Sequence, residues 1–232
     1  MYLYETHLHT APTSTCARVG VRETLEFYKA AGYAGVFMTN HFLDGNIDLA
    51  LRGLPYEERI AGFFAATEEG QAIGKEIGLA VFSGFEMSNG GTDFLVYGID
   101  KAWCLAYTDM DKMKKSEILS QMIADGALVI QAHPFREARY IDHIRLYPRC
   151  VQGVEVYNAC RSAFENKMAT EYCKNYGLIP FAGSDNHSGA AHPRFGGMAT
   201  DTLVENEQDF IKKVLSLQAK PFIKDEKGFV IL

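Results

Sequence analysis

Residues 2–10 read YLYETHLHT: a short run with the alternation of a β-strand, and then two histidines two positions apart. On an extended chain, residues i and i+2 point to the same side, roughly 6–7 Å apart, so His7 and His9 can both reach one metal ion. A His-x-His pair alone is a weak signal for a metal, because it is more often a solvated or hydrogen-bonded pair. The rest of the chain decides between these interpretations.

Short apolar runs alternate with amphipathic helical stretches along the whole chain. This alternation predicts an α/β protein in which helices connect parallel strands, and the uniformly apolar runs predict strands buried on both faces. The predicted strands cover residues 2–5, 35–38, 79–83, 94–99, 127–131, 154–157 and 178–182. The predicted helices cover residues 21–31, 57–77, 111–125, 160–176 and 206–217. Long loops are expected at 43–56 and 185–198, a length that is often functional.

The chain has 232 residues, of which 47% are hydrophobic and 22% charged, with a formal net charge of −6. This composition predicts one globular domain over residues 1–232, and the absence of a linker or repeat agrees with it. Five cysteines without a paired spacing, after a start that lacks a signal-peptide pattern, predict a reduced, cytoplasmic protein. No apolar run is long enough for a membrane helix, and the negative charge disfavours a nucleic-acid partner.

Residue types that bind metals stand at or just beyond the ends of the predicted strands. They are His7, His9, His41, Glu86, His133, Glu155, Asp185 and His187. In a parallel α/β barrel the carboxyl ends of the strands carry the active site, because the loops that follow the strands converge there. The residues therefore predict one metal site at that edge, although a single histidine such as His41 or His133 would have little meaning by itself.

The ligand types are imidazole nitrogen and carboxylate oxygen, which suit zinc, manganese or iron. The set exceeds what one tetrahedral site can use, so two or more ions are expected, with a carboxylate such as Glu86 shared between them. Two ions at a short separation suit the hydrolysis of a phosphate ester, because they lower the pKa of water and stabilise both the entering and the leaving oxygen.

These residues resemble the PHP family, named for polymerase and histidinol phosphatase, along most of the chain. The motifs are Glu5-Thr-His7-Leu-His9-Thr10, Thr39-Asn40-His41, Gly84-Phe85-Glu86, Ala132-His133-Pro134 and Gly183-Ser184-Asp185-Asn186-His187. The resemblance implies a distorted (β/α)7 TIM-like barrel with two or three divalent metal ions at the C-terminal ends of its strands. It also implies metal-dependent hydrolysis of phosphoesters.

The resemblance further implies how the ligands are shared among the ions. His7, His9, Glu86 and Asp185 would hold one ion. Glu86 would bridge to a second ion that His133 also holds, and His41 with His187 would hold a third.

The chain departs from the family pattern at three positions. Cys16 stands near the place where the family has a histidine or aspartate, and we interpret it as a metal ligand, a reactive thiol or a small buried residue. Glu155 is the nearest counterpart of the residue that completes the second site. Asn40 replaces the aspartate that usually precedes the histidine of the second motif.

A phosphate also needs cationic donors, and arginine offers two parallel ones. The candidates near the expected site are Arg18, Arg136, Arg161 and Arg194, each of which could instead be an ordinary surface charge. His192 could protonate the leaving oxygen or bind a metal, or could simply be solvated.

Together with the resemblance, the sequence predicts a phosphoric ester hydrolase that acts on a small phosphomonoester. Small molecules, nucleotides and phosphotyrosine proteins are all substrates that the resemblance implies. The substrate would be attacked by a metal-activated hydroxide. An amidohydrolase-type C–N hydrolase is the first alternative, since such barrels also begin with His-x-His. A metal-binding regulatory module without catalysis is the second.

Overall fold

The computed structural model describes residues 1–110, 112–192 and 194–232. Their strands are β1 (Tyr2–Leu8), β2 (Gly35–Met38), β3 (Ala80–Asn89), β4 (Thr92–Tyr97), β5 (Leu128–Ala132), β6 (Gly153–Asn158), β7 (Ile179–Gly183), β8 (Phe195–Thr200), β9 (Ala219–Asp225) and β10 (Gly228–Ile231). Their α-helices are α1 (Val21–Ala30), α2 (Tyr56–Ile77), α3 (Lys101–Ala106), α4 (Lys115–Ala124), α5 (Ala163–Tyr176) and α6 (Glu207–Leu215), and short 3-10 helices cover Leu49–Leu51 and Gly189–Ala191.

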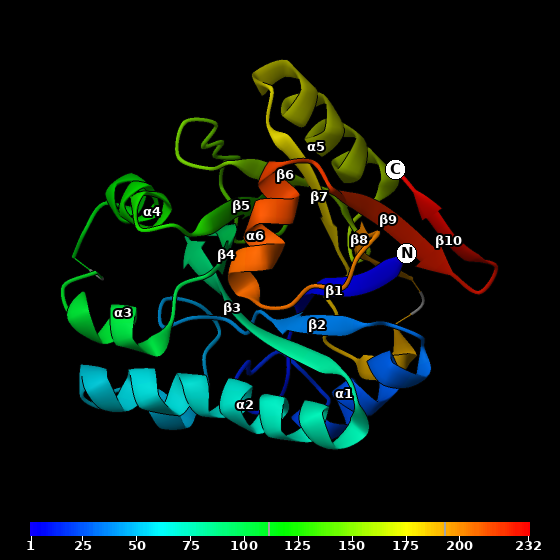
Figure 1. Cartoon of the computed structure of the whole chain (residues 1–232). Coiled ribbons are helices and arrows are strands. Elements are labelled where there is room, and N and C mark those ends of the chain that lie inside the picture. The colour runs from blue at the N-terminus through cyan, green and yellow to red at the C-terminus, as the bar shows by residue number, and fades with distance from the viewer. Residues whose placement is uncertain (111, 193) are drawn as a thin grey trace.

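The described strands form one sheet in the order β10-β9-β8-β1-β2-β3-β4-β5-β6-β7 (Figure 1). Strands β1 to β3 are parallel to one another, as are β5 to β7. The sheet is curled, so that β7 comes back beside β1: Asn186, which lies just beyond the end of β7, pairs with Leu8. The carboxyl ends of the parallel strands therefore gather on one side of a half-barrel.

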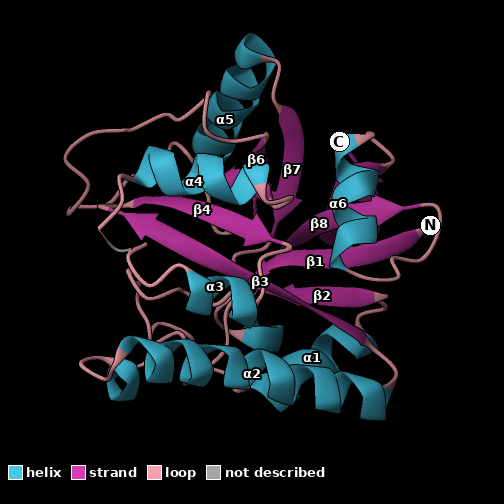
Figure 2. Ribbon diagram, turned by 60° about the vertical axis from the view of Figure 1, so that its left-hand side comes forward, coloured by secondary structure: helices cyan, strands magenta, loops and turns pink. Residues whose placement is uncertain are grey.

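The structure corrects the prediction that all strands run parallel. β4, predicted at 94–99, runs antiparallel to both β3 and β5 (Figure 2). Only Gly90 and Gly91 separate β3 from β4, and both have positive φ. A two-residue connection can join only antiparallel neighbours, since a parallel pair needs a long crossover.

Other parts of the prediction also differ from the structure. Strands β8, β9 and β10 and helix α3 were not predicted, and β8 begins inside the stretch expected as the loop 185–198. The helix predicted at 111–125 corresponds to α4, and residue 111 lies outside the described residues. The structure thus confirms an α/β fold with a curled, half-barrel sheet, while the count of seven β/α units is not confirmed.

An apolar cluster around α6 fills part of the half-barrel. Phe210 of α6 is fully buried, and its ring centre lies 4.2 Å from that of Phe37 and 5.7 Å from that of Tyr97. Side chains from β1 to β5 and from β7 to β9 join this cluster. Because this interior is apolar, the polar side chains gather at the carboxyl ends of the strands.

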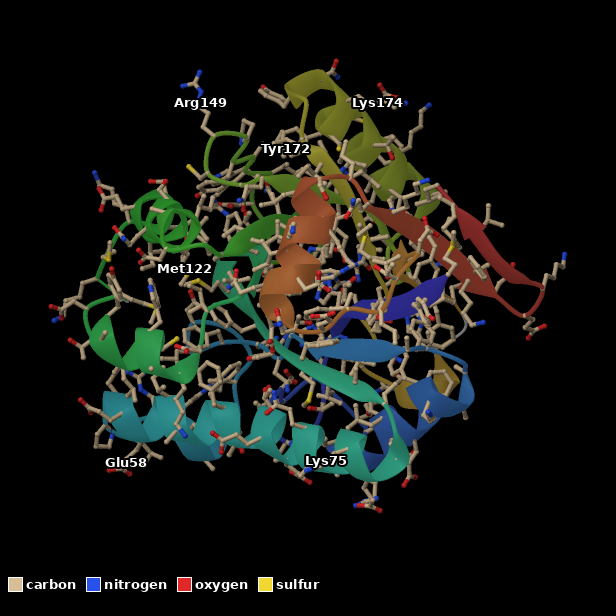
Figure 3. The ribbon with its side chains drawn as sticks, viewed as in Figure 1. Glu58, Lys75, Met122, Arg149, Tyr172 and Lys174 are labelled. Atoms are coloured by element: carbon tan, nitrogen blue, oxygen red, sulfur yellow. The ribbon has the colours of Figure 1, made fainter. Side chains whose placement is uncertain are left out.

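Helix α2 covers another face of the sheet, with Phe63 and Phe64 buried and Glu58 and Lys75 projecting outward (Figure 3). In the described ranges, no helix combines the length and the apolar character needed to cross a membrane.

Candidate metal centre

His7 and His9 lie side by side at the end of β1, as predicted. Both are buried, and their Nε2 atoms are 3.2 Å apart. Nδ1 of His7 lies 2.9 Å from Oε1 of Glu155, and Nδ1 of His9 lies 3.2 Å from Oγ of Ser14. Because a carboxylate can only accept, Nδ1 of His7 donates, and Nε2 then keeps its lone pair in the neutral ring.

Glu86 stands between four histidines. Its Oε1 lies 3.3 Å from Nε2 of His7 and 3.2 Å from Nε2 of His133. Its Oε2 lies 2.8 Å from Nδ1 of His41 and 3.6 Å from Nε2 of His9. One carboxylate thus contacts four imidazole rings, an arrangement that fits a ligand shared within a metal site.

Asp185 completes the group from the end of β7. Its Oδ1 lies 3.5 Å from Nε2 of His7 and 3.4 Å from Nε2 of His9. Asp185 and His133 adopt φ of 57° and 25°, in the left-handed region. Such backbone strain costs about 1–3 kcal/mol at a residue and is typical of functional sites.

The donor atoms form three overlapping groups, each within 4.8 Å. The groups are His9, His41 and His187; His7, His9 and Asp185; and His7, Glu86 and His133. Nδ1 of His41 and Oε2 of Glu86 are buried close together, yet neither atom has a well-directed hydrogen bond with a described residue. Buried donor atoms of this kind fit a shared cation, so the residues present fit divalent metal ions.

The charges of the cluster are strongly coupled. Burial raises the pKa of Glu86, but His41 and His7 outweigh burial and hold it well below its usual value. Burial lowers the pKa of His41, but Glu86 and the Cys16 thiol outweigh it and raise the pKa to about 10. A divalent ion bound by His41 would therefore have to displace a proton from that ring.

Cys16 lies at the rim of the cluster as an exposed residue. Burial of its sulfur raises its pKa, but hydrogen bonds with His187 and His41 outweigh this effect and lower the pKa to about 6. A thiolate beside these histidines is chemically suited to the group of His9, His41 and His187. The structure therefore places Cys16 beside His41 and His187 at the rim of the cluster.

Glu155 lies behind His7 and belongs to none of the metal-binding groups found among the described residues. It is fully buried behind His7, where its Oε1 contacts Nδ1 of His7. Its Oε2 accepts hydrogen bonds from the backbone N–H of His133 and from Nδ2 of Asn158, at 3.0 and 2.9 Å. Both oxygens are engaged by protein groups, so the geometry favours orientation of His7 over the predicted metal ligation.

Asn40 also acts from behind the cluster. Its Oδ1 accepts from the backbone N–H of Thr10 at 2.7 Å and from Oγ of Ser14 at 2.8 Å. Ser14 in turn contacts Nδ1 of His9. The asparagine at this position thus orients His9 through Ser14.

Asp93 is a buried residue of the site that the sequence analysis missed. Its Oδ2 lies 3.2 Å from Nη2 of Arg136 and 3.8 Å from Nε2 of His133. Asp93 stands at the start of β4, so a parallel β4 would place it at the wrong edge of the sheet. Because β4 runs antiparallel to β3, Asp93 lies at the metal cluster. The Gly90-Gly91 pair in the sequence could have indicated the tight turn that makes β4 antiparallel.

Arg136 borders a cavity of about 400 Å³ that reaches His41 and Asp93. Its Nε is buried without a hydrogen-bond partner among the described residues. Tyr140 lines the same cavity and accepts a hydrogen bond from Nη2 of Arg136 at 2.8 Å. Arg136 is therefore placed as predicted, beside the cluster and facing open space.

The remaining predicted residues lie farther out. Arg18 is exposed, and its backbone N–H donates to the carbonyl of His187 at 2.8 Å. Arg194 donates to the carbonyl of Ala159 at 3.1 Å. Nε2 of His192 lies 3.1 Å from the sulfur of Cys160, and its Nδ1 contacts the carbonyl of Arg194.

His192 belongs to none of the metal-binding groups found among the described residues. Both of its ring nitrogens contact protein atoms, an arrangement that does not favour proton transfer to a substrate. The side chain of Arg161 has a buried Nε without a described partner.

No family model matches the chain, and no curated protein matches it in sequence. Solved structures do match. A two-domain protein from Bacteroides vulgatus, described as containing a PHP-like metal-dependent phosphoesterase, is 13% identical with a TM-score of 0.68; the match covers 95% of this chain and 64% of that one. This chain therefore spans less than two thirds of that protein.

Two further structures match over nearly their whole length. A protein from Bifidobacterium adolescentis described as a metal-dependent phosphoesterase is 14% identical, with a TM-score of 0.55 and coverage of 93% of this chain and 96% of that one. An amidohydrolase from Chromobacterium violaceum, with bound sulfate and no metal, gives the same four values. The chain thus shares the fold of proteins described as PHP-like metal-dependent phosphoesterases.

Proposed function

We propose that this protein is a metal-dependent phosphoesterase that hydrolyses a phosphomonoester. The observation that carries the proposal is Glu86, whose two oxygens contact four histidines from three segments of the chain. This arrangement suits two or three divalent ions, of zinc, manganese or iron, that share one carboxylate.

The residues of the three groups would hold the ions, with Cys16 added to the group of His9, His41 and His187. Divalent ions in such a site supply Lewis acidity, which lowers the pKa of water and neutralises charge on the phosphate oxygens. Glu155 orients His7, and Ser14 orients His9, so that Nε2 of each ring faces the centre.

Arg136 supplies the positive charge beside the centre. Asp93 fixes its guanidinium at 3.2 Å, and the cavity in front of it has room for a phosphate group. We assign Arg136 to phosphate binding, since an arginine can give two parallel hydrogen bonds to phosphate oxygens. Arg18, beside His187, is the second candidate for this role.

The amidohydrolase among the similar structures makes C–N hydrolysis the alternative. A panel of phosphomonoesters, phosphodiesters and N-acyl amino acids, offered to metal-reconstituted protein, separates the two. Phosphate release from monoesters supports the proposal. Hydrolysis of the amides without phosphate release would instead identify the protein as a C–N hydrolase.

A further inference from the structure

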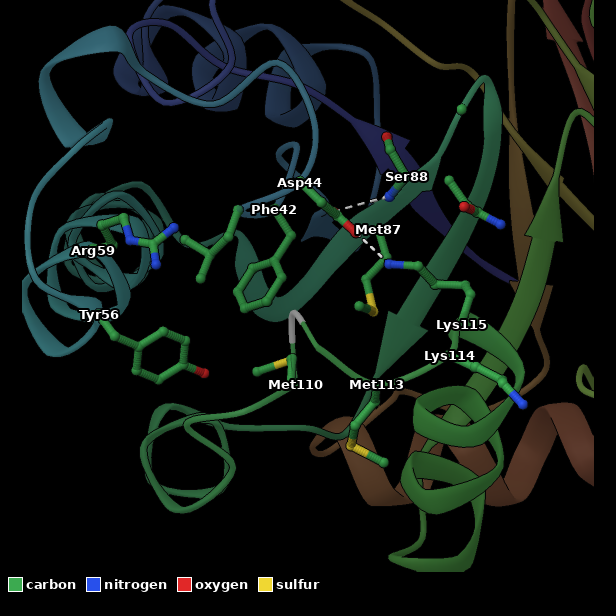
Figure 4. A pocket seen from close by; sticks show the side chains of 13 residues that line it. Phe42, Asp44, Tyr56, Arg59, Met87, Ser88, Met110, Met113, Lys114 and Lys115 are labelled. Atoms are coloured by element: carbon green, nitrogen blue, oxygen red, sulfur yellow. Dashed lines mark hydrogen bonds and ion pairs between the residues drawn. The ribbon is translucent and has the colours of Figure 1, made fainter.

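A second cavity, of about 510 Å³, adjoins the one at the candidate metal centre (Figure 4). Its walls combine polar and charged residues with an apolar group, formed by Phe42, Tyr56 and three flexible methionines, Met87, Met110 and Met113. Methionine side chains are polarizable and adapt to the shape of what they enclose. The cavity is therefore suited to an organic group with aromatic or aliphatic carbon.

This cavity shares a wall with the one that reaches His41 and Arg136. Asp44, Ser88 and Gly90 line both. The backbone N–H of Ser88 donates to Oδ1 of Asp44 at 3.1 Å. A molecule with its phosphate beside Arg136 can therefore extend across this wall into the apolar cavity.

The cavity carries three cations, of which two have partners. Lys115 pairs with Asp44, and Lys114 lies 3.8 Å from Glu117. Arg59 has no ion pair or side-chain hydrogen bond with any residue of the described ranges, and its Nε is buried. Its guanidinium carbon lies 5.7 Å from the ring centre of Tyr56.

Figure 4 shows Arg59 at the end of the cavity away from the Asp44–Ser88 wall. A guanidinium at this place, without an ion-pair partner in the part of the chain that the structure describes, favours an anionic group on the ligand, because a partly buried cation without a partner is costly. The same charge disfavours a ligand whose organic part carries an amine.

We infer that this cavity binds the organic part of the substrate, an apolar body that ends in a carboxylate paired with Arg59. The inference rests on the proposed function, since it takes the phosphate of the same molecule to lie at the metal centre. The substrate class is then a phosphomonoester with an apolar, carboxylated leaving group.

The test compares two series of aryl phosphates on metal-reconstituted protein. One series carries a para-carboxylate with none, one or two methylene groups between it and the ring, and the other carries the corresponding carboxamides. The inference predicts that kcat/KM for at least one carboxylate exceeds that of its carboxamide by about tenfold or more, the value of a charge-assisted hydrogen bond.

The variant Arg59→Gln should lower kcat/KM for that carboxylate to the level of its carboxamide. Arg149→Gln, at an exposed arginine away from the cavity (Figure 3), is the matched control and should retain the preference. Met113→Trp, which fills the cavity, should weaken both series. Equal rates for both series in the wild-type protein, or an equal loss for both in Arg59→Gln, would overturn the inference.

Binding of the dephosphorylated products separates this inference from the proposed function. The para-hydroxyaryl carboxylates should bind the wild-type protein in a calorimetric titration and bind Arg59→Gln at least about tenfold more weakly. If they do so while no phosphomonoester is hydrolysed, the proposed function fails and the cavity assignment stands. If they bind both proteins equally or neither, the cavity assignment is wrong.

Discussion

At the scale of single residues, the candidate centre depends on how each histidine is held. His7 is fixed by Glu155 and His9 by Ser14, so the Nε2 atoms of both rings face Glu86 and Asp185. Partners of this kind behind a metal ligand typically change metal affinity by about 10–100-fold when they are removed.

The variant Glu155→Gln tests whether Glu155 orients His7 or binds a metal. We expect every metal ion still to bind, but with an affinity reduced by roughly 10–100-fold, measured by competition with a chelator. Glu58→Gln, at an exposed glutamate of α2, should leave the affinity unchanged. Loss of one whole metal equivalent in Glu155→Gln would show that Glu155 is itself a ligand.

Metal binding should release protons, because the pKa of His41 is raised to about 10 and the ring is protonated at neutral pH. A metal ligand must be deprotonated, so the apparent metal affinity should rise with pH up to a pH near the pKa of His41. Calorimetric titrations at about pH 7.5 in buffers of different ionisation enthalpy measure the release. Binding without proton release would contradict the assignment of His41 as a ligand.

The histidines and acids of the centre could be predicted because each follows an apolar strand-like run. The position of Glu155 behind His7 could not be predicted, since sequence order does not show whether a carboxylate points at a metal or at the back of a histidine. Asp93 could not be found without the direction of β4. Arg59 was not singled out, because its significance depends on its place in a cavity where no described residue forms an ion pair with it.

At the scale of elements, the close approach of β8 to β1 depends on Gly197. Its φ is 150°, and a Cβ atom there would lie 2.0 Å from the carbonyl oxygen of Tyr4. Neither a side chain nor the backbone can relieve such an overlap without separating the two strands.

Gly197→Ala should lower the free energy of unfolding by about 3–4 kcal/mol, measured by urea denaturation. Gly53→Ala is the matched control: its φ of 84° also disfavours alanine, but no atom lies within 4 Å of the new Cβ. The control should lose only about 1–2 kcal/mol. Equal losses in the two variants would show that the contact with Tyr4 is unimportant.

Strands β1, β2 and β5 to β7 could be predicted from their apolar runs, and their order along the chain indicated an α/β fold. Strands β8 to β10 could not be placed, because β8 contains two glycines and β10 is largely exposed. Such strands gain stability from pairing within the sheet, which local sequence does not reveal.

At the scale of the whole molecule, the metal centre and the fold should stabilise each other. The ligands come from β1, from the loop after β2, from β3, and from the ends of β5 and β7, so bound ions link distant parts of the chain. A ligand that binds only the folded state stabilises it by mass action.

Adding metal at about 100 times its dissociation constant should raise the melting temperature by roughly 5–10 °C, and a chelator should reverse the shift. The variant His9→Ala, which removes a member of two metal groups, should show a smaller shift. A melting temperature that is insensitive to both metal and chelator would contradict a metal centre.

The most direct test of the central claim is phosphate release as a function of bound metal, for the wild-type protein beside Glu86→Gln. The account predicts no release without metal, turnover of a phosphomonoester that appears as at least two equivalents bind, and loss of most of that turnover in Glu86→Gln. Release that survives metal removal, or that Glu86→Gln leaves intact, would contradict a carboxylate-bridged metal phosphoesterase.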